Sequence, residues 1–299
     1  MPFLQPGVII LTFNRRDALA RTLRELASQG LTDVTVVDNA STDGTCDMLT
    51  RDFPSARAIA LPRNSGVTGY NIGVRECRAD NVLILDDDSW PDAGVIEQAC
   101  EFLSANTRTA AVALLPRHPK TFTDEWRFAP KVGRSFWPVM GCGNLVRRDA
   151  WLGVGGYEEE FFLYRNDTDL ALKLLASGRD VYFNPKWVVW HDSPAATIKH
   201  ERWLRYATRN WVWMCRRHGR GRWKLIAEAA GVAWAARLAG FDLDRLGEVA
   251  RGAREGFHRY APTMPATVTP DGSALRELVR IQLGAHFPAV NPRSPAAGR

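Results

Sequence analysis

Short apolar runs alternate with segments of helical periodicity along the first 115 residues of the chain. The runs are rich in leucine and β-branched residues and are flanked by polar ones, which is typical of buried strands. Because strands and helices alternate over short connections, we expect a parallel sheet covered by helices on both faces. The pattern predicts strands at 8–12, 34–37, 58–61, 82–85 and 110–115, and helices at 16–28, 45–51, 69–75 and 94–104.

The pattern changes after residue 115. Residues 116–139 are rich in proline, aromatic and basic residues, which indicates a long functional loop or hairpin. A strand at 139–146 follows, and the glycines inside it indicate a close approach of backbones. The rest of the chain predicts a helix at 168–176, a strand at 181–190, helices from about 200 onwards, and a disordered tail at 288–299.

Composition limits the class of protein. A chain of 299 residues with 45% hydrophobic content can form one large domain, or one domain with an appendage. The net charge of +6 is unevenly distributed, because the segment 199–224 holds many Arg and Lys residues and few acids. Such a basic face suits phosphates, an acidic partner or a lipid surface.

The five cysteines are scattered without zinc-site spacing, which favours buried thiols in a reducing compartment. No signal peptide is expected, because the apolar run at 8–11 is too short and no basic segment precedes it. The longest apolar stretch, around 225–240, is interrupted by Glu228 and Arg237 and does not predict a membrane span. We therefore expect a soluble or peripheral protein.

Three consecutive carboxylates, Asp86, Asp87 and Asp88, follow the strand at 82–85. In an open α/β sheet, ligands bind in the crevice beyond the carboxyl ends of the strands. Adjacent carboxylates raise one another's pKa unless a positive group neutralises them, and a divalent cation that also holds phosphate oxygens is a natural partner. The alternative is an acidic turn that caps the next helix, because residues 89–92 resemble a helix start.

Polar residues and glycines also follow the first three strands, at the same edge of the sheet. Asp38 can accept hydrogen bonds from a base or ribose, and Gly66 allows a backbone to approach a nucleotide at a helix N-terminus. The alternative is that these residues only build turns and N-caps. The candidates for holding a nucleotide ligand are Thr12, Asn14, Arg15, Asp38, Asn64, Gly66, Asn71, Asp86 and Asp87.

Taken in order, these motifs resemble the family 2 glycosyltransferases, and the resemblance covers about residues 7–215. Its segments are 12–14, 37–44, 64–73, 85–88, 155–162, 166–170 and 190–191. The resemblance implies a GT-A fold: α/β, Rossmann-like, with a mostly parallel central sheet, here with a helical C-terminal extension. It also implies inverting transfer of a sugar from a UDP- or dTDP-sugar. The segments around 162 and 190 are most similar to bacterial rhamnosyl- and galactofuranosyltransferases.

The family's motifs assign roles to particular residues. Asp86, Asp88 and His191 would hold Mg²⁺ or Mn²⁺ against the donor diphosphate, Asp38 would hold the base or ribose, and Asp167 would be the catalytic base. Asn166 stands where many relatives carry a second acid, so the basic function rests on Asp167 alone. Taken singly, Asp167 also fits a helix N-cap, and His191 a structural histidine.

Three residues are candidates for the acceptor side. Trp137 can stack on a sugar or acceptor ring, and Gly141 leaves room for one; core packing and turn formation are the competing interpretations. Asp169 lies one helical position beyond the expected N-terminus, where it can also simply stabilise the helix dipole.

The predicted division is a GT-A catalytic domain at 1–198, helices at 199–287 and the tail. Within the catalytic domain, the nucleotide-sugar half would end near 115 and the acceptor half would occupy 116–198. We expect a cytoplasmic enzyme. If its basic region binds lipid or an acidic carrier protein, the enzyme would be peripheral at the inner face of the membrane.

The expected partners are a nucleotide-sugar donor and a small-molecule, glycan or carrier-bound acceptor with a free hydroxyl or amine; no nucleic acid is expected. Cell-surface glycan and natural-product biosynthesis both fit. A sugar-phosphate nucleotidyltransferase is a weaker alternative because no early Gly-rich loop with Arg and Lys is present. A dehydrogenase lacks its dinucleotide fingerprint. A non-catalytic nucleotide-binding protein remains a further alternative.

Overall fold

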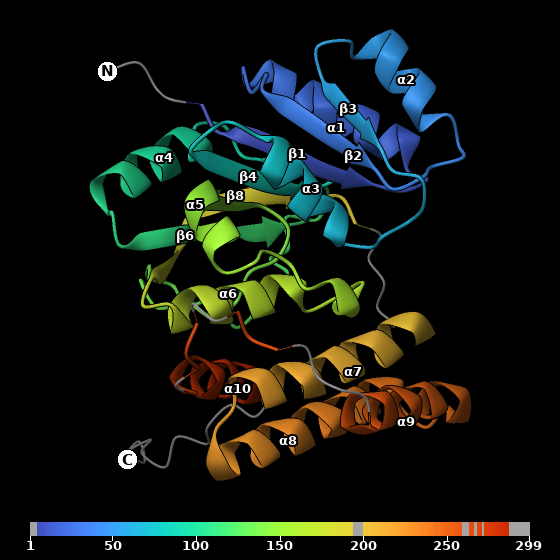
Figure 1. The fold of residues 1–299 in the computed structure, drawn as a ribbon, viewed down its shortest axis with the longest axis vertical. Coiled ribbons are helices and arrows are strands. Elements are labelled where there is room, and N and C mark those ends of the chain that lie inside the picture. Colours follow the sequence, from blue (N-terminus) through green and yellow to red (C-terminus); the bar gives the residue numbers. More distant parts are fainter. Residues whose placement is uncertain (1–4, 194–199, 259–262, 266–267, 271, 287–299) are drawn as a thin grey trace, which may run out of the picture.

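The computed structural model describes residues 5–193, 200–258, 263–265, 268–270 and 272–286. An eight-stranded mixed sheet forms its centre, with the C-terminal helices packed below it (Figure 1). The strands are β1 Gly7–Thr12, β2 Val34–Asp38, β3 Arg57–Ala60, β4 Asn81–Asp86, β5 Ser89–Pro91, β6 Thr109–Arg117, β7 Asn144–Arg147 and β8 Asp180–His191. The helices of the sheet region are α1 Arg16–Ser28, α2 Thr45–Asp52, α3 Thr68–Glu76, α4 Val95–Ala105, α5 Arg148–Gly153 and α6 Asn166–Ala176, with a short 3-10 turn at Glu159–Phe161.

The strand order is β3-β2-β1-β4-β7-β6-β8-β5. β3, β2, β1 and β4 are parallel, as are β6 and β8, whereas β7 is antiparallel to both of its neighbours. The carboxyl ends of β1, β2 and β4 therefore meet at one edge of the sheet. The prediction of a parallel sheet holds for this first half and was incomplete for the second.

One alternative and one prediction were wrong, whereas the helix predicted at 94–104 is confirmed as α4. The segment 89–92 does not start a helix: it forms β5, which pairs antiparallel with β8, and α4 begins at Val95. The expected strand at 139–146 is shorter in the structure: β7 begins only at Asn144, directly after Gly143, whose φ of +74° does not fit an extended strand. Residues 118–143 form the expected long connection, held by isolated bridges to β6 and β8.

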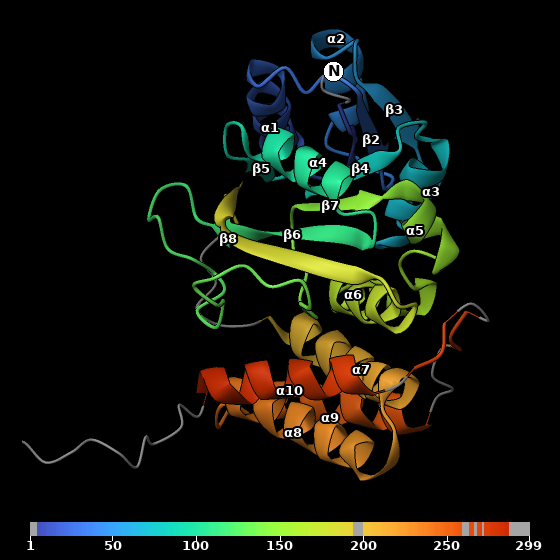
Figure 2. The same cartoon turned by 90° about the vertical axis from the view of Figure 1, so that its left-hand side faces the viewer.

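Alternation along the strands creates two cores. Val8, Ile10 and Leu83 face α1, α2 and α4, whereas Ile9, Val82 and Ile84 face the opposite core. That second core extends through α5 and α6 to side chains of α7 and α10. A strand that is apolar on both faces is the pattern of a sheet covered on both sides, and Figure 2 shows the sheet between these layers.

The C-terminal region is helical, as expected. It consists of α7 Glu201–His218, α8 Gly221–Ala239, α9 Leu243–His258 and α10 Ser273–His286. α7 lies below α6 and joins the helical region to the sheet region (Figures 1 and 2). Within the described part of the chain, no helix is both long and apolar enough to cross a bilayer. The predicted disordered tail lies outside the described residues.

Candidate active site

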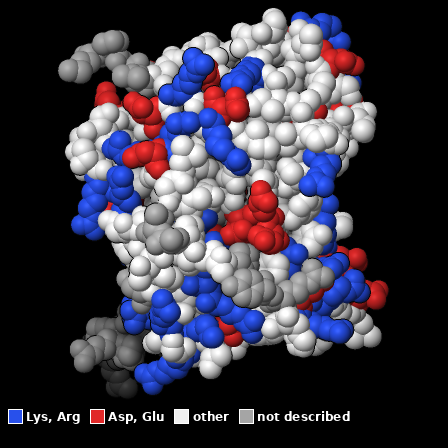
Figure 3. All heavy atoms as spheres, viewed as in Figure 1, with Lys and Arg blue, Asp and Glu red and all other residues white. Residues whose placement is uncertain are grey.

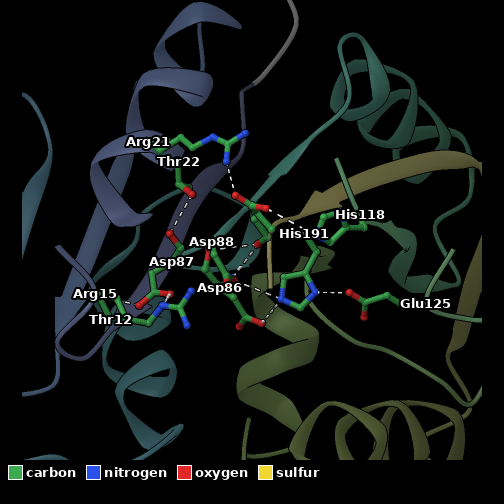
Figure 4. Close-up of polar contacts among 12 residues, drawn as sticks. Thr12, Arg15, Arg21, Thr22, Asp86, Asp87, Asp88, His118, Glu125 and His191 are labelled. Atoms are coloured by element: carbon green, nitrogen blue, oxygen red, sulfur yellow. Dashed lines mark hydrogen bonds and ion pairs between the residues drawn. The ribbon is translucent and has the colours of Figure 1, made fainter. Parts of the chain in front are cut away.

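The acidic run and His191 meet because β5 turns back along β8. Ser89 pairs with His191 across these two strands, which places Asp88 beside the imidazole. The Nε2 atom of His191 lies 3.3 Å from Oδ1 of Asp88 and 3.9 Å from Oδ2 of Asp86 (Figure 4). Residues separated by about a hundred positions thus form one cluster of two carboxylates and an imidazole.

The other ring nitrogen of His191 contacts Glu125. Its Nδ1 lies 2.6 Å from Oε1 of Glu125, which comes from the long connection between β6 and β7 (Figure 4). An Nδ1–H donated to this carboxylate leaves Nε2 directed at Asp86 and Asp88. Burial opposes a charged imidazole, but the surrounding Cys142, Asp88 and Glu125 raise the pKa of His191.

Arg15 and Thr12 neutralise the inner carboxylates. Asp87 accepts a hydrogen bond from the Thr12 hydroxyl at 2.9 Å and an ion pair from Nε of Arg15 at 3.0 Å. The guanidinium also pairs with Asp88 at 2.5 Å. Burial outweighs these contacts at Asp87 and raises its pKa to about 7. Burial also disfavours the Asp88 carboxylate, but His191 and Arg15 together lower its pKa.

A cavity of about 570 Å³ opens over these side chains. The ends of β1, β4 and β8 line one wall, and residues 162–164 and the start of α7 line the other. The Asp86 side chain is 48% exposed at this cavity, while Asp87 and Asp88 are buried. The predicted residues in its lining are Thr12, Arg15, Asn64, Gly66, Asp86, Asp87, Asp88 and His191.

A second cavity of about 230 Å³ adjoins the first, because Asp86, Tyr70 and Tyr164 line both. Asp167, on the first turn of α6, is part of its lining. Burial raises the pKa of Asp167 to about 6, against the opposing effects of the Thr168 amide and Arg165. Asp86 raises it further, so the two carboxylates affect each other across the junction.

Several nucleotide candidates lie beside the first cavity rather than in its described lining. The buried Asp38 carboxylate contacts Ser41 and the Cys46 thiol. Asn14 accepts a hydrogen bond from the Thr42 amide at 2.7 Å and so joins two strand-end loops. The side-chain amide of Asn71 is hydrogen-bonded to the backbone of Tyr157 and to the indole N–H of Trp151. Their predicted contacts with a nucleotide remain predictions.

Gly66 was predicted to let the backbone approach a nucleotide, but in the structure it lets the backbone approach Phe162. Its φ is +59°, and a Cβ there would collide with the backbone of Phe162. The Val67 amide donates to the Phe162 carbonyl at 2.8 Å. The glycine therefore joins the two walls of the first cavity, whatever contact it makes with a ligand.

Two acceptor candidates are not accessible. Trp137 is completely buried and stacks on Phe183 with ring centroids 5.0 Å apart, so it belongs to the core. Asp169 is completely buried and lies 2.8 Å from Nε2 of His218 and 3.1 Å from Nη1 of Arg217. Its prediction as an acceptor residue was wrong, and its role is to connect α6 with α7. Gly141, in contrast, does line the second cavity.

Sequence reasoning missed Glu125, Tyr70 and Cys142. The Tyr70 hydroxyl lies 2.8 Å from Oδ1 of Asp86 at the junction of the cavities. Cys142 presents Sγ to the same place: atoms of Asp86, Cys142 and His191 all lie within 4.8 Å of one another. Glu125 and Cys142 belong to the connection without periodicity, where the sequence offered no spacing that relates them to His191.

A GT-A fold and a strand-end cluster of carboxylates with a histidine define the class of a glycosyltransferase. Residues 7–168, more than half of the chain, match the model of glycosyl transferase family 2, and the chain belongs to this family. The match favours the leading sequence prediction over a nucleotidyltransferase or a dehydrogenase.

Similar proteins agree with this class. The N-acetylglucosaminyl-diphospho-decaprenol L-rhamnosyltransferase of Mycobacterium tuberculosis is 25% identical over 238 residues, which cover 64% of this chain and 76% of that protein. The mannosyltransferase of Pyrobaculum calidifontis, solved with GDP-Man and Mn²⁺, superposes with a TM-score of 0.57 at 20% identity, over 94% of this chain and 85% of the other. TarS of S. aureus gives a TM-score of 0.60 at 15% identity, over 83% and 81% of the two chains.

Proposed function

We propose that this protein transfers a sugar from a nucleotide-diphosphate donor to a hydroxyl or amine, with inversion at the anomeric carbon. The observation that carries the proposal is the pair of adjoining cavities that share Asp86. The larger has the size and the strand-end position of a donor site, and the smaller holds a single carboxylate suited to act as a base. A nucleotide sugar that spans both would place its anomeric carbon between the cluster and Asp167.

The donor set at the junction fits a divalent cation. Asp86, Asp88 and His191 offer two carboxylates and an imidazole nitrogen, and Glu125 orients the imidazole from behind. A bound Mg²⁺ or Mn²⁺ would supply Lewis-acid stabilisation of the departing diphosphate. The Pyrobaculum enzyme was solved with GDP-Man and Mn²⁺, which supports the same pairing of donor and cation here.

Asp167 is the proposed catalytic base. With its pKa raised to about 6, it is ionised at neutral pH and still basic enough to accept a proton from the attacking acceptor. Since the reaction needs one base and one direct displacement, no second carboxylate nucleophile is required, and the anomeric centre is inverted.

Asn166 supports binding of a hydroxyl-rich group in the second cavity. Its side chain is only 3% exposed, and neither amide atom has a hydrogen-bond partner among the described residues. Buried amide groups are normally paired, and an unpaired one is unfavourable until a ligand satisfies it. A sugar hydroxyl of the donor or acceptor would do so, next to the proposed base.

The predicted division between a donor half and an acceptor half also fits the cavities. The first cavity is lined mainly by strand ends before residue 115 and the second largely by residues 141–167, although 162–164 and His191 also close the donor side. The M. tuberculosis relative is named for an acceptor linked through a diphosphate to decaprenol. We infer a carrier-linked acceptor for this chain as well, in the cytoplasm at a membrane surface.

The N-terminal part of α8 fits such a surface. Trp223, Leu225 and Ile226 are 40%, 61% and 44% exposed, and the neighbouring Arg222 in the first turn of α8 is exposed as well. Glu228, the single acid of α8, is buried and pairs with Arg216. We call Arg222, Trp223, Leu225 and Ile226 the α8 patch. An exposed helix face that is apolar and basic is typical of contact with anionic lipid.

A second copy of the chain fits this patch less well, because two such faces would bring like charges together. Figure 3 shows Lys and Arg side chains gathered over the helical region. One part of the predicted basic surface is not surface at all: Arg217 is buried and pairs with Asp169 and Glu158.

The proposed activity is tested by incubating the purified protein with UDP-, dTDP- and GDP-sugars, Mn²⁺ and a panel of carrier-linked and soluble acceptors. Mass spectrometry should detect a glycosylated acceptor, and NMR should show an anomeric configuration opposite to that of the donor. A product with retained configuration would contradict the single-displacement mechanism.

A further inference from the structure

The connection before β7 brings a thiol to the cation site. Gly143, with φ +74°, lies against β8 so closely that a Cβ there would be 2.7 Å from Val189. The Leu114 amide donates to the Gly143 carbonyl, and the Asn144 amide group contacts the Gly141 carbonyl. These contacts fix the backbone on both sides of Cys142. Val189, which Gly143 approaches, lies two residues before His191 on β8.

The position of Cys142 suits a ligand. Oxygen, sulfur and nitrogen atoms of Asp86, Cys142 and His191 are within 4.8 Å of one another. Metal–ligand bonds of about 2.0–2.3 Å place the ligand atoms of one ion roughly 3–4 Å apart, so only a small side-chain adjustment is needed. Oδ2 of Asp88 pairs with Arg15, so Asp88 faces the cluster through Oδ1, which lies 3.3 Å from Nε2 of His191.

We propose that Cys142 is a direct ligand of the divalent cation, and this inference rests on the cation site proposed above. The sulfur–metal bond replaces the S–H bond, the proton passes to solvent, and no group is oxidised or reduced. A mixed oxygen, nitrogen and sulfur set favours thiophilic borderline ions such as Zn²⁺ and Co²⁺ over Mg²⁺. The site should therefore bind Zn²⁺ and Co²⁺ much more tightly than a site of carboxylates and imidazole alone.

Cobalt gives a readout that does not depend on activity. The full-length protein, stripped with a chelator, is titrated with Co²⁺ while its ultraviolet spectrum is recorded. A cysteine ligand should give sulfur-to-cobalt charge-transfer absorption in the wild type. Cys142→Ser should remove that absorption and weaken Zn²⁺ binding by at least about tenfold, the lower end of what altered outer-shell partners cost. Its Mg²⁺ affinity should hardly change.

Cys46→Ser is the matched control, because Cys46 is another partly buried thiol in hydrogen-bond contact with a carboxylate, that of Asp38. Its cobalt spectrum should equal that of the wild type. Cys142→Ala provides a second variant, and thermal unfolding of each variant without metal checks that it is folded.

The outcomes separate the two proposals. Cobalt binding without charge-transfer absorption, or absorption that survives in both Cys142 variants, overturns the assignment of Cys142 and leaves the cation site intact. Failure of the wild type to bind Co²⁺, Mn²⁺ or Zn²⁺ with or without nucleotide overturns both.

Discussion

Asp167 occupies the first turn of α6 beside Asn166 and lines the smaller cavity. Asp167→Asn keeps the shape of the side chain and removes its basicity. Transfer should fall by about 10²–10⁴-fold, the usual contribution of a general base, while nucleotide binding is retained. Steady-state kinetics and calorimetry measure the two effects, and transfer at the wild-type rate would restrict Asp167 to a structural role in the first turn of α6.

The pH dependence of transfer follows from the ionisation of Asp167. A base must be unprotonated, and burial raises the pKa of Asp167 to about 6. The kcat/KM of transfer should therefore rise with pH through about 6 and level off above it. A profile that stays flat down to pH 5, well below that pKa, would show that this carboxyl does not take the proton.

Glu125 is expected to act through His191. Glu125→Gln removes the charge that holds the Nδ1–H, and should lower Mn²⁺ affinity by about 10–100-fold. Asp124→Asn is the matched control, because the neighbouring carboxylate pairs with Arg117 instead. Calorimetry on the two variants would separate orientation of the histidine from a general loss of negative charge, which both changes share.

The sequence located the carboxylates and His191 because motif order relates distant segments even without contacts. Glu125 and Cys142 escaped this reasoning, since they lie in a connection whose path is set by glycines and isolated bridges rather than by periodicity. Trp137 and Asp169 were predicted to face an acceptor, although both are buried. Aromatic and acidic side chains look available in a sequence, and only packing shows that they are buried.

At the scale of elements, a buried group of charges joins α6 to α7. Asp169 and Glu158 accept ion pairs from Arg217 at 3.1 and 2.8 Å, and Lys173 lies 3.5 Å from Asp169. Breaking a buried pair by removing one partner leaves an uncompensated charge in the interior. Because α6 carries Asp167, this group also fixes the N-terminal turn that lines the second cavity.

Arg217→Ala should lower the free energy of unfolding by about 3–5 kcal/mol. Arg222→Ala, an exposed arginine on the next helix, should change it little. Urea unfolding followed by circular dichroism gives both values. Equal stability of the two variants would mean that Lys173 and His218 alone compensate Asp169.

This group of buried charges also makes the stability of the fold depend on pH. Burial opposes the Asp169 carboxylate, but Lys173, His218 and Arg217 hold its pKa well below the ordinary value. Its contribution is complete above the pKa of the unfolded chain and is lost as the pH falls through the folded-state pKa. The difference in stability between the wild type and Asp169→Asn should therefore shrink in acid.

The sequence predicted the early strands and helices well, because each is a short apolar run or an amphipathic segment of ordinary length. β5 and β7 were harder. β5 has only three residues, and its pairing with β8 depends on a chain reversal after Asp88 that no local signal specifies. Tertiary contacts decide such segments, which explains why the second half of the sheet is mixed.

At the scale of the whole molecule, the α8 patch is the feature on which the proposed membrane contact rests. The double variant Leu225→Glu, Ile226→Glu should reduce co-sedimentation with vesicles that contain anionic phospholipid, and wild-type binding should weaken with salt. Leu152→Glu, a 40% exposed leucine on α5, is the control and should bind like the wild type. Equal binding to purely zwitterionic vesicles, insensitive to salt, would remove the electrostatic part of this proposal.

The central claim is that the strand-end cluster holds a nucleotide diphosphate together with a divalent cation. Calorimetric titration of the wild type and of Asp88→Ala with UDP, dTDP and GDP, each with and without Mn²⁺, tests it most directly. The wild type should bind at least one of these nucleotides, and Mn²⁺ should strengthen that binding. Asp88→Ala should lose the enhancement. Nucleotide binding that is indifferent to Mn²⁺ and unchanged in Asp88→Ala, or no binding of any of the three, would contradict the claim.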